Sequence, residues 1–313
     1  SLVILLYRIK WTGLIPFLEG LGYCCVYVVV LSGVRYFLRC LSWAAAFFPD
    51  ERPTIGQLLG GQLAGDAIGY FSFAGPLLGE PLKASLLQNT ALIRALGSTL
   101  LETFVYSICA TAVTGAGSIL LLVVMVWGPG MRATGIWTSA LLLLAFVSVA
   151  LLLVPDTPLF ASLAHSIRKI PWIAKSKAEA KLSAIAEQAH FLRQRRPGAL
   201  WVMFAIGIAS QVLLACEIAL VLWTTGHHPS LSSLLIIEAS TKAVKTLFFF
   251  VPARVGADEG SSAAVFFGLG MEPSLGIALT MIRRVRALFW GLIGLLYLAW
   301  IGRRERRGAE RES

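Results

Sequence analysis

Charged side chains are scarce in this sequence of 313 residues, at 14% against the roughly 25% of ordinary soluble proteins. Apolar residues make up 57% of the chain, and the mean hydropathy is +0.76. Several stretches of about 18 or more residues carry no charge at all, which is typical of membrane-spanning helices. The composition therefore excludes a water-soluble globular protein and predicts an integral membrane protein.

Signatures of catalysis and metal binding are also missing. The sequence has no GxxxxGK phosphate loop, no GxSxG elbow and no HExxH pair, so nothing predicts an ATPase, a serine hydrolase or a zinc protease. The five cysteines lie in apolar segments without metal-type spacing and are expected to be buried thiols. The four histidines lie in predicted loops. We therefore expect no enzyme activity, no catalytic residues, no metal and no cofactor.

Basic residues give the chain a net charge of +10, and they gather between and after the apolar stretches. Eight of the 27 lie in the loop 155–197, and five lie in the tail 302–313. The positive-inside rule places both segments in the cytoplasm, so the charge is interpreted as orienting a protein in the cell (plasma or inner) membrane. No nucleic-acid partner is expected.

Five apolar stretches are long enough to cross a bilayer, and two shorter, interrupted elements lie among them. Because the loop 155–197 and the tail share one side, the chain must cross an even number of times between them. Two full spans already supply those crossings, so the second interrupted element is predicted to be a re-entrant hairpin, and the same argument applies to the first. The predicted spans are about 18–40, 99–127, 133–154, 198–223 and 275–301, and the interrupted elements are about 54–90 and 231–272.

The two interrupted elements contain similar sequences, FAGPLLGE at 73–80 and FVPARVGADEG at 250–260. Proline removes a backbone donor and glycine permits unusual dihedral angles, so such breaks at membrane depth are tolerated only inside protein or beside a wet cavity. Paired breaks of this kind are typical of the binding site of a transporter built from inverted repeats. The predicted hairpin breaks are Pro76, Gly79, Pro252 and Gly256.

The predicted fold is an all-α, polytopic helical bundle with inverted repeats and two re-entrant broken-helix hairpins. Each repeat consists of a span, a hairpin and a span, and the two repeats have opposite orientation. The alternative is a bundle of about six or seven simple helices that proline and glycine merely kink. A single domain over 1–313 would contain repeat one at about 18–127, a connecting span and cytoplasmic loop at about 128–197, repeat two at about 198–301 and a basic tail at 302–313.

Charged residues inside these apolar segments are the candidates for function, because a charge at bilayer depth costs about 3 kcal/mol or more. They could neutralise one another and hold helices together, which we favour for Glu80 and Glu259. Unpaired cations near a break could instead bind an anionic headgroup, which we favour for Lys242, Lys245 and Arg254. The residues predicted to bind a lipid headgroup are Glu80, Lys83, Lys242, Lys245, Arg254 and Glu259. The supporting intramembrane charges are Arg35, Arg39, Arg94, Glu102, Asp258, Arg283 and Arg284.

Four short patterns follow one another along nearly the whole chain. They are Arg-x(3)-Arg at Arg35 and Arg39, Pro-x-x-Gly-Glu at Pro76 to Glu80 with Lys83 soon after, Pro-x(3)-Gly-x-x-Glu-Gly at Pro252 to Gly260, and an arginine at Arg283 or Arg284 in the last span. Their order and spacing resemble the flippase-like membrane domain of lysylphosphatidylglycerol synthases, which also occurs in stand-alone proteins. The resemblance implies movement of a phospholipid or an aminoacylated phospholipid between leaflets without a nucleotide motor. The tail 302–313 stands where the synthases continue into an aminoacyl-transfer domain, so synthase activity is not expected.

The leading hypothesis is a lipid transporter whose partners are membrane lipids with an anionic headgroup. One alternative is a membrane enzyme that acts on a polyprenyl-phosphate or phospholipid headgroup, with Glu80 and Glu259 as acid–base groups. Another is a non-catalytic accessory subunit of a lipid or envelope pathway that binds a cytoplasmic partner through the loop 155–197. That loop predicts either an amphipathic surface helix or a polar connector. The glycines between 56 and 65 suit close helix packing, within one chain or in a homo-oligomer.

Overall fold

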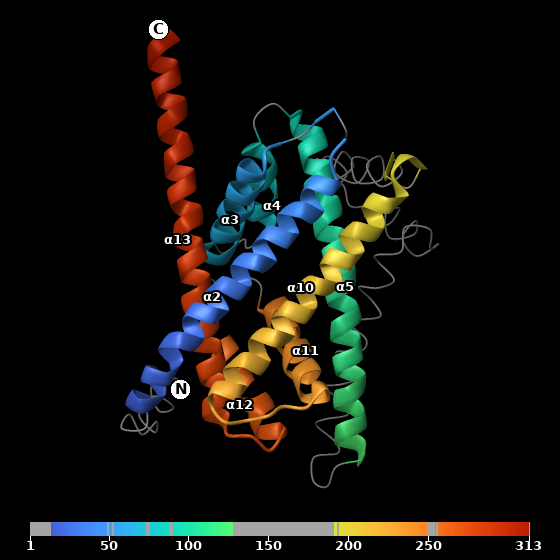
Figure 1. Ribbon diagram of the computed structural model, residues 1–313, viewed down its shortest axis with the longest axis vertical. Helices are drawn as coiled ribbons and strands as arrows, with labels where there is room; N and C mark the ends of the chain where they lie inside the picture. The colour runs from blue at the N-terminus through green and yellow to red at the C-terminus, as the bar shows by residue number, and fades with distance from the viewer. Residues whose placement is uncertain are drawn as a thin grey trace, which may run out of the picture.

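Helices account for all the regular structure in the part of the chain that can be described. The computed structural model describes residues 14–48, 50–51, 53–72, 76–87, 90–127, 191–192, 194–248, 254 and 256–312. Over those ranges the main elements are eight helices, with no strand (Figure 1). They are α2 (Leu14–Ala45), α3 (Ile55–Phe71), α4 (Pro76–Ser85), α5 (Leu92–Trp127), α10 (Pro197–Thr224), α11 (Leu231–Leu247), α12 (Ala257–Gly268) and α13 (Pro273–Glu312).

Four of these helices, α2, α5, α10 and α13, are long and apolar enough to cross a bilayer. They confirm the prediction of an all-α polytopic membrane protein, and they correspond to four of the five predicted spans. α13 is longer than the predicted span because it continues through the basic tail to Glu312. The predicted span at 133–154, most of the loop 155–197 with its predicted amphipathic helix, and residues 1–13 lie outside the described residues.

The first interrupted element is the helix pair α3 and α4. α3 begins at a capping box, in which the Thr54 hydroxyl accepts from the Gln57 N–H and the Thr54 N–H donates to the Gln57 side chain. It ends at Phe71, and α4 begins at Pro76, since the first position of a helix tolerates a residue without an N–H. The predicted break therefore separates two helices.

The second interrupted element is the helix pair α11 and α12. Ser230 caps the start of α11 by accepting from the Ser233 N–H at 3.2 Å. Between the two helices the backbone φ is positive, at 46° for Arg254 and 87° for Gly256. The Gly256 N–H donates to Glu259 Oε2 at 2.8 Å and so begins α12. Pro252, the other predicted break residue, lies outside the described residues.

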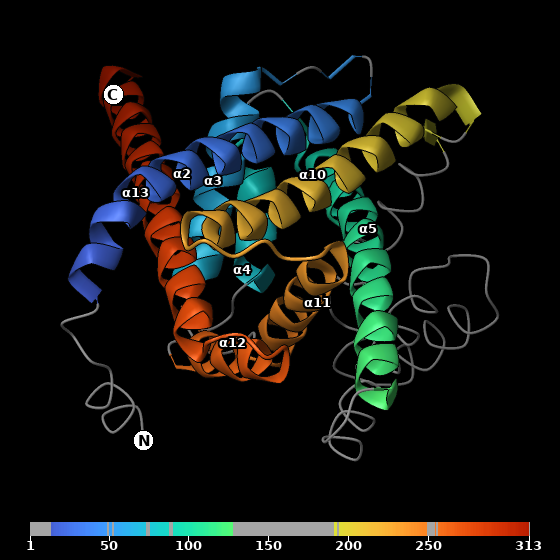
Figure 2. The ribbon, with the colours of Figure 1, turned by 60° about the horizontal axis from the view of Figure 1, so that its bottom comes forward.

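The helices have the same pattern of neighbours in both halves of the chain. In this pattern α2 corresponds to α10, α3 to α11, α4 to α12 and α5 to α13. The two first helices, α2 and α10, pack on each other. In the first half α3 packs on α13, α4 packs on α5, and α2 contacts α3 and α13; in the second half α11 packs on α5, α12 packs on α13, and α10 contacts α11 and α5. Figure 1 shows α3 and α4 in the upper half of the bundle and α11 and α12 in the lower half. In Figure 2, α2 and α10 run side by side across the other helices. The inverted-repeat relation and the insertion of each pair from one membrane face remain predictions.

Two glycines allow helix backbones in corresponding positions to approach closely. A Cβ at Gly294 of α13 would collide with the backbone of Leu63 in α3, and a Cβ at Gly117 of α5 would collide with the backbone of Leu235 in α11. Such contacts replace side-chain packing with direct backbone proximity, as is common between membrane helices. They hold each interrupted pair against the long helix of the other half.

Candidate functional site

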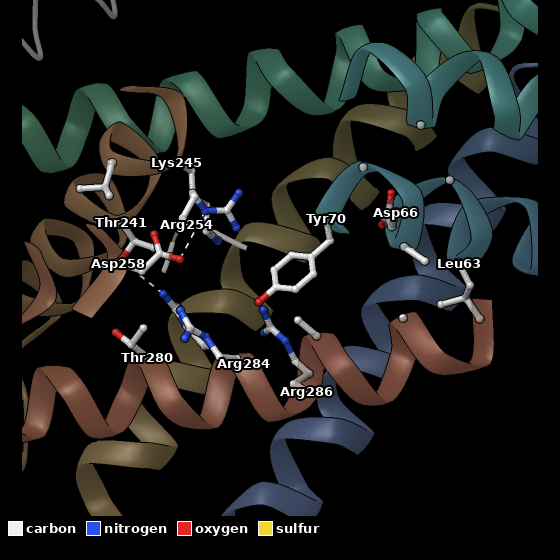
Figure 3. Close-up of a pocket in the computed structure, with 18 of the residues that line it drawn as sticks. Leu63, Asp66, Tyr70, Thr241, Lys245, Arg254, Asp258, Thr280, Arg284 and Arg286 are labelled. Atoms are coloured by element: carbon white, nitrogen blue, oxygen red, sulfur yellow. Dashed lines mark hydrogen bonds and ion pairs between the residues drawn. The ribbon is translucent and has the colours of Figure 1, made fainter. Parts of the chain in front are cut away.

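A cavity of about 360 Å³ lies where the breaks of the two helix pairs meet (Figure 3). The end of α3 and the start of α4 line one part of it, and the end of α11 and the start of α12 line another. α13 completes the wall, and Tyr36 of α2 also borders it. Residues that flank the two predicted breaks, far apart in the sequence, therefore line one cavity, and of the predicted break residues Gly79 is among them.

Charged side chains dominate the cavity wall. Three acids and five bases line it, which leaves a formal excess of two positive charges. The acids are Asp66, Glu80 and Asp258, and the bases are Lys245, Arg254, Arg283, Arg284 and Arg286. The lining side chains therefore present more basic than acidic groups to the interior of the cavity.

The first helix pair presents the acidic part of the wall. Lys83 Nζ lies 2.9 Å from Asp66 Oδ1 and 3.0 Å from Glu80 Oε1, and Lys83 itself is only 2% exposed. Glu80 Oε2 also accepts from the Thr103 hydroxyl of α5 at 3.0 Å. One buried cation thus serves two carboxylates, so this part of the wall keeps a negative balance.

The second helix pair and α13 present the basic part. Arg254 Nε lies 3.3 Å from Asp258 Oδ2, and the Arg254 guanidinium lies 5.9 Å from the centre of the Tyr70 ring of α3. Arg284 of α13 pairs with Glu259. Figure 3 shows Tyr70 between Asp66 on one side and Lys245, Arg254 and Asp258 on the other. Tyr70 thus lines the cavity between Asp66 and the group that contains Arg254.

Two arginines of α13 are held by carboxylates behind the cavity. Arg283 Nε donates to Glu217 Oε1 at 2.8 Å, and its Nη2 donates to Glu238 Oε2 at 3.0 Å. Arg286 pairs with the second oxygen of Glu217. Glu217 and Glu238 are each 2% exposed, so these ion pairs join α10, α11 and α13 inside the protein.

Three of the six residues predicted to bind a headgroup line the cavity, namely Glu80, Lys245 and Arg254. The other three do not. Lys83 lies behind the two acids described above, and Glu259 accepts from the Gly256 N–H. Lys242 donates to Gln211 Oε1 at 2.6 Å and lies 3.4 Å from Glu238 Oε1. Since Glu259 does not line the cavity, the structure does not present Glu80 and Glu259 as a facing acid–base pair there.

The predicted supporting residues separate in the same way. Asp258, Arg283 and Arg284 line the cavity, as does the predicted break residue Gly79. Arg39 and Glu102 instead form a buried bidentate pair between α2 and α5 at 2.8 and 3.0 Å. Arg35 is next to the lining residue Tyr36, and Arg94 is an exposed residue that pairs with Asp50 and Glu51.

Several lining residues were not among the predicted site residues, including Tyr36, Tyr70 and Thr241. Aromatic and hydroxyl side chains in apolar stretches give no functional signal by themselves, because such residues are common in membrane helices. Asp66 and Arg286 did carry a signal, since each is a charge within an apolar segment.

Comparison with known proteins assigns the chain to one family. The family model described as the lysylphosphatidylglycerol synthase TM region matches residues 1–301. No curated protein and no solved structure matches the chain. The matched range contains all four described spans up to Ile301 and both helix pairs that form the cavity.

Proposed function

Because the chain belongs to the family of the lysylphosphatidylglycerol synthase transmembrane region, we propose that it is a lipid transporter. Membership of this family indicates a function related to membrane lipids. The proposed activity is movement of a phospholipid with an anionic or aminoacylated headgroup from one leaflet to the other. The headgroup would occupy the cavity while the acyl chains stay in the bilayer.

The observation that carries this proposal is the position of the cavity between two helix breaks. Helix breaks at membrane depth need surrounding protein or water, and here both border the same charged space. Its volume of about 360 Å³ falls within the range of small-molecule sites, roughly 300–1,000 Å³. The excess of two positive charges suits a phosphate group, which an apolar bilayer excludes.

The two parts of the wall give the headgroup an orientation. Lys245, Arg254 and Arg284 would hold the phosphate, because ammonium and guanidinium groups form strong charge-assisted hydrogen bonds with phosphate oxygens. Asp66 and Glu80 would face a cationic group further out on the headgroup, such as the amine of an aminoacylated lipid. An anionic headgroup without an amine would use only the basic part.

The repeated pattern of helix neighbours supports a movement that exposes the cavity to each leaflet in turn. Each interrupted pair packs on the long helix of the other half, α3 on α13 and α11 on α5. Rocking of one half against the other would therefore open one side of the cavity while closing the other. With the loop 155–197 and the tail assigned to the cytoplasm, α3 and α4 would insert from the cytoplasmic side and α11 and α12 from outside.

A leaflet-exchange assay on purified protein in phosphatidylcholine liposomes tests the proposal. Fluorescent phosphatidylglycerol, phosphatidylethanolamine and lysyl-phosphatidylglycerol would each be added, and the fraction protected from a membrane-impermeant quencher would be followed. Protein-dependent exchange with a preference among headgroups is expected. An Arg254→Ala variant should slow exchange of phosphatidylglycerol about tenfold, the value of one charge-assisted contact.

Arg94→Ala is the matched control, since Arg94 is an exposed arginine away from the cavity. Folded wild-type protein that exchanges none of the three lipids would overturn the transporter assignment. Equal rates in the wild type and in Arg254→Ala would overturn the headgroup role of Arg254.

A further inference from the structure

Lys245 differs from the other four basic residues of the cavity wall. Arg254, Arg283, Arg284 and Arg286 each form an ion pair with a carboxylate. Within the described ranges no carboxylate forms an ion pair with Lys245, although its side chain lines the cavity. Lys242, one turn earlier on α11, has Glu238 and Gln211 as partners. Among the residues that the structure describes, Lys245 is therefore the wall cation for which no carboxylate lies within ion-pair distance.

The acids around Lys245 already have other cations as ion-pair partners. On its own helix, Glu238 lies two turns earlier and is shared by Arg283 and Lys242. The acids that face the cavity from other elements are already paired: Asp258 with Arg254, and Asp66 and Glu80 with Lys83. On the other helices packed against α11, Glu217 of α10 pairs with Arg283 and Arg286, and Glu102 and Tyr106 of α5 are directed at Arg39. The remaining titratable lining groups are the guanidinium groups of α13 and the hydroxyls of Tyr36 and Tyr70.

A lysine in such surroundings favours its neutral form. Burial removes the ammonium from water, and neighbouring positive charges repel it. Burial, followed by the charge of Arg283, lowers the pKa of the Lys245 amine to about 7. α11 lies outside the four spans, and the Lys245 side chain lines the cavity, where a ligand can reach it.

We propose that Lys245 takes up a proton when an anionic headgroup enters the cavity and releases it when the headgroup leaves, so that lipid and proton cross together. The inference rests on the proposed function and adds its coupling ion. A phosphate in the basic part of the cavity would supply a counter-ion for Lys245, and by linkage the ligand that favours the ammonium form is itself bound more tightly when the proton is present.

The proton balance of one cycle is simple. On the side where the cavity is open, the Lys245 amine accepts a proton from water, and the resulting ammonium donates to a phosphate oxygen. On the other side the lipid leaves, the N–H bond breaks, and water takes the proton. A phosphatidylglycerol with one negative charge therefore crosses with one proton and no net charge. The empty carrier returns with a neutral Lys245.

A pH gradient across liposomes tests the coupling. Protein would be reconstituted in phosphatidylcholine vesicles with acyl-labelled phosphatidylglycerol, with the outside one pH unit more acidic than the inside and the range centred near pH 7. One proton per lipid predicts that the label accumulates about tenfold in the inner leaflet, because one pH unit is a tenfold ratio of proton activity. Reversing the gradient should reverse the accumulation, and protein-free vesicles should show neither.

Variants at Lys245 distinguish the effect of a positive charge at this position from the effect of its gain and loss of a proton. Lys245→Arg keeps a cation that cannot lose its proton, so exchange should persist while the tenfold accumulation falls to an even distribution. Lys245→Met removes the cation, and exchange of phosphatidylglycerol should slow about tenfold. Lys242→Arg is the matched control on the same helix, and it should retain the response to the gradient.

The possible results are distinct. Wild-type protein that exchanges phosphatidylglycerol but distributes it evenly under a gradient would overturn the coupling and leave the transporter assignment intact. A gradient response that survives Lys245→Arg would place the proton on another group and equally overturn the inference. Absence of exchange by folded wild-type protein, at any pH, would overturn the proposed function and the coupling with it.

Discussion

The two halves of the molecule, α2 to α5 and α10 to α13, have matching neighbours but opposite chemistry. In the first half, the cation Arg39 stands on the first helix and the acid Glu102 on the last. In the second half, the acid Glu217 stands on the first helix and the cations Arg283 and Arg286 on the last. In each half, ion pairs thus join the first helix to the last, but the helix that carries the acid and the helix that carries the cation are exchanged.

The cavity shows the same contrast. The first helix pair contributes two acids, Asp66 and Glu80, and the second contributes two bases, Lys245 and Arg254, with one acid, Asp258. The arrangement of the helices is therefore independent of the charges that they carry. Close packing of small residues can give both halves the same helix arrangement, while single substitutions determine whether a position of the cavity wall is acidic or basic. A ligand that meets unlike walls is bound in one orientation, which two identical halves could not impose.

The largest expected effect comes from the junction of the second half. Glu217→Gln would leave Arg286 without its partner and Arg283 with only Glu238, and removing one member of a buried ion pair costs about 3–5 kcal/mol. Glu102→Gln, the equivalent change in the first half, leaves only Arg39 without its carboxylate partner and should lower the stability less. Thermal unfolding in detergent, followed by size-exclusion chromatography, would compare them. Equal losses would show that the second arginine adds nothing.

The next effect should be the same in both halves. Gly117→Ala and Gly294→Ala each place a methyl group against a facing helix backbone, and overpacking of this kind costs about 1–3 kcal/mol. Gly302→Ala is the control, because nothing lies near its Cβ position. Similar losses of thermal stability in the first two variants are expected. A loss in only one would show that the two contacts are not equivalent.

A smaller effect should distinguish the two walls of the cavity. Glu80→Gln removes an acid near the proposed amine position and should slow exchange of lysyl-phosphatidylglycerol, relative to phosphatidylglycerol, by roughly three- to tenfold. Arg254→Ala removes a contact with the phosphate that both lipids carry, so it should slow both exchange rates and leave their ratio close to that of the wild type. The ratio of the two exchange rates in one preparation is the measurement, so differences in reconstitution cancel. An unchanged ratio in Glu80→Gln would contradict an oriented headgroup.

The smallest effect is expected outside both junctions. Arg94→Ala removes an ion pair whose arginine is 51% exposed, and exposed pairs contribute less than about 1 kcal/mol. Unfolding temperature and exchange rate should both stay close to those of the wild type. A large loss would mean that Arg94 is buried in the membrane-embedded protein, as the apolar sequence around it first indicated.

The sequence predicted the positions of the helices better than the side-chain pairs that join them. Hydropathy located the four described spans, and the breaks after Phe71 and Leu247 followed from proline and glycine. The pair of Glu238 with Lys242 is local, four residues apart on one helix. Pairs such as Arg283 with Glu217 join residues 66 positions apart, and no periodicity within a segment contains that information.

The same limit explains why the sequence predicted only some of the residues that line the cavity. Charge within apolar sequence marked Glu80, Lys245 and Arg254, all of which line the cavity. It marked Lys83, Lys242 and Glu259 equally, because hydropathy cannot distinguish a charge that faces a cavity from one that is satisfied behind it. Tyr70 was not marked, since its place between the two walls depends on how the halves pack.

The length of α13 makes it a natural lever. The helix carries Arg283, Arg284 and Arg286 at the cavity and continues without interruption to Glu312. From Arg284 to that end it extends roughly 42 Å, so a tilt of ~5° about the cavity would displace the far end by ~4 Å. A spin or fluorescent label at the exposed Arg303 would thus report, from outside the bundle, the rocking movement proposed for the two halves.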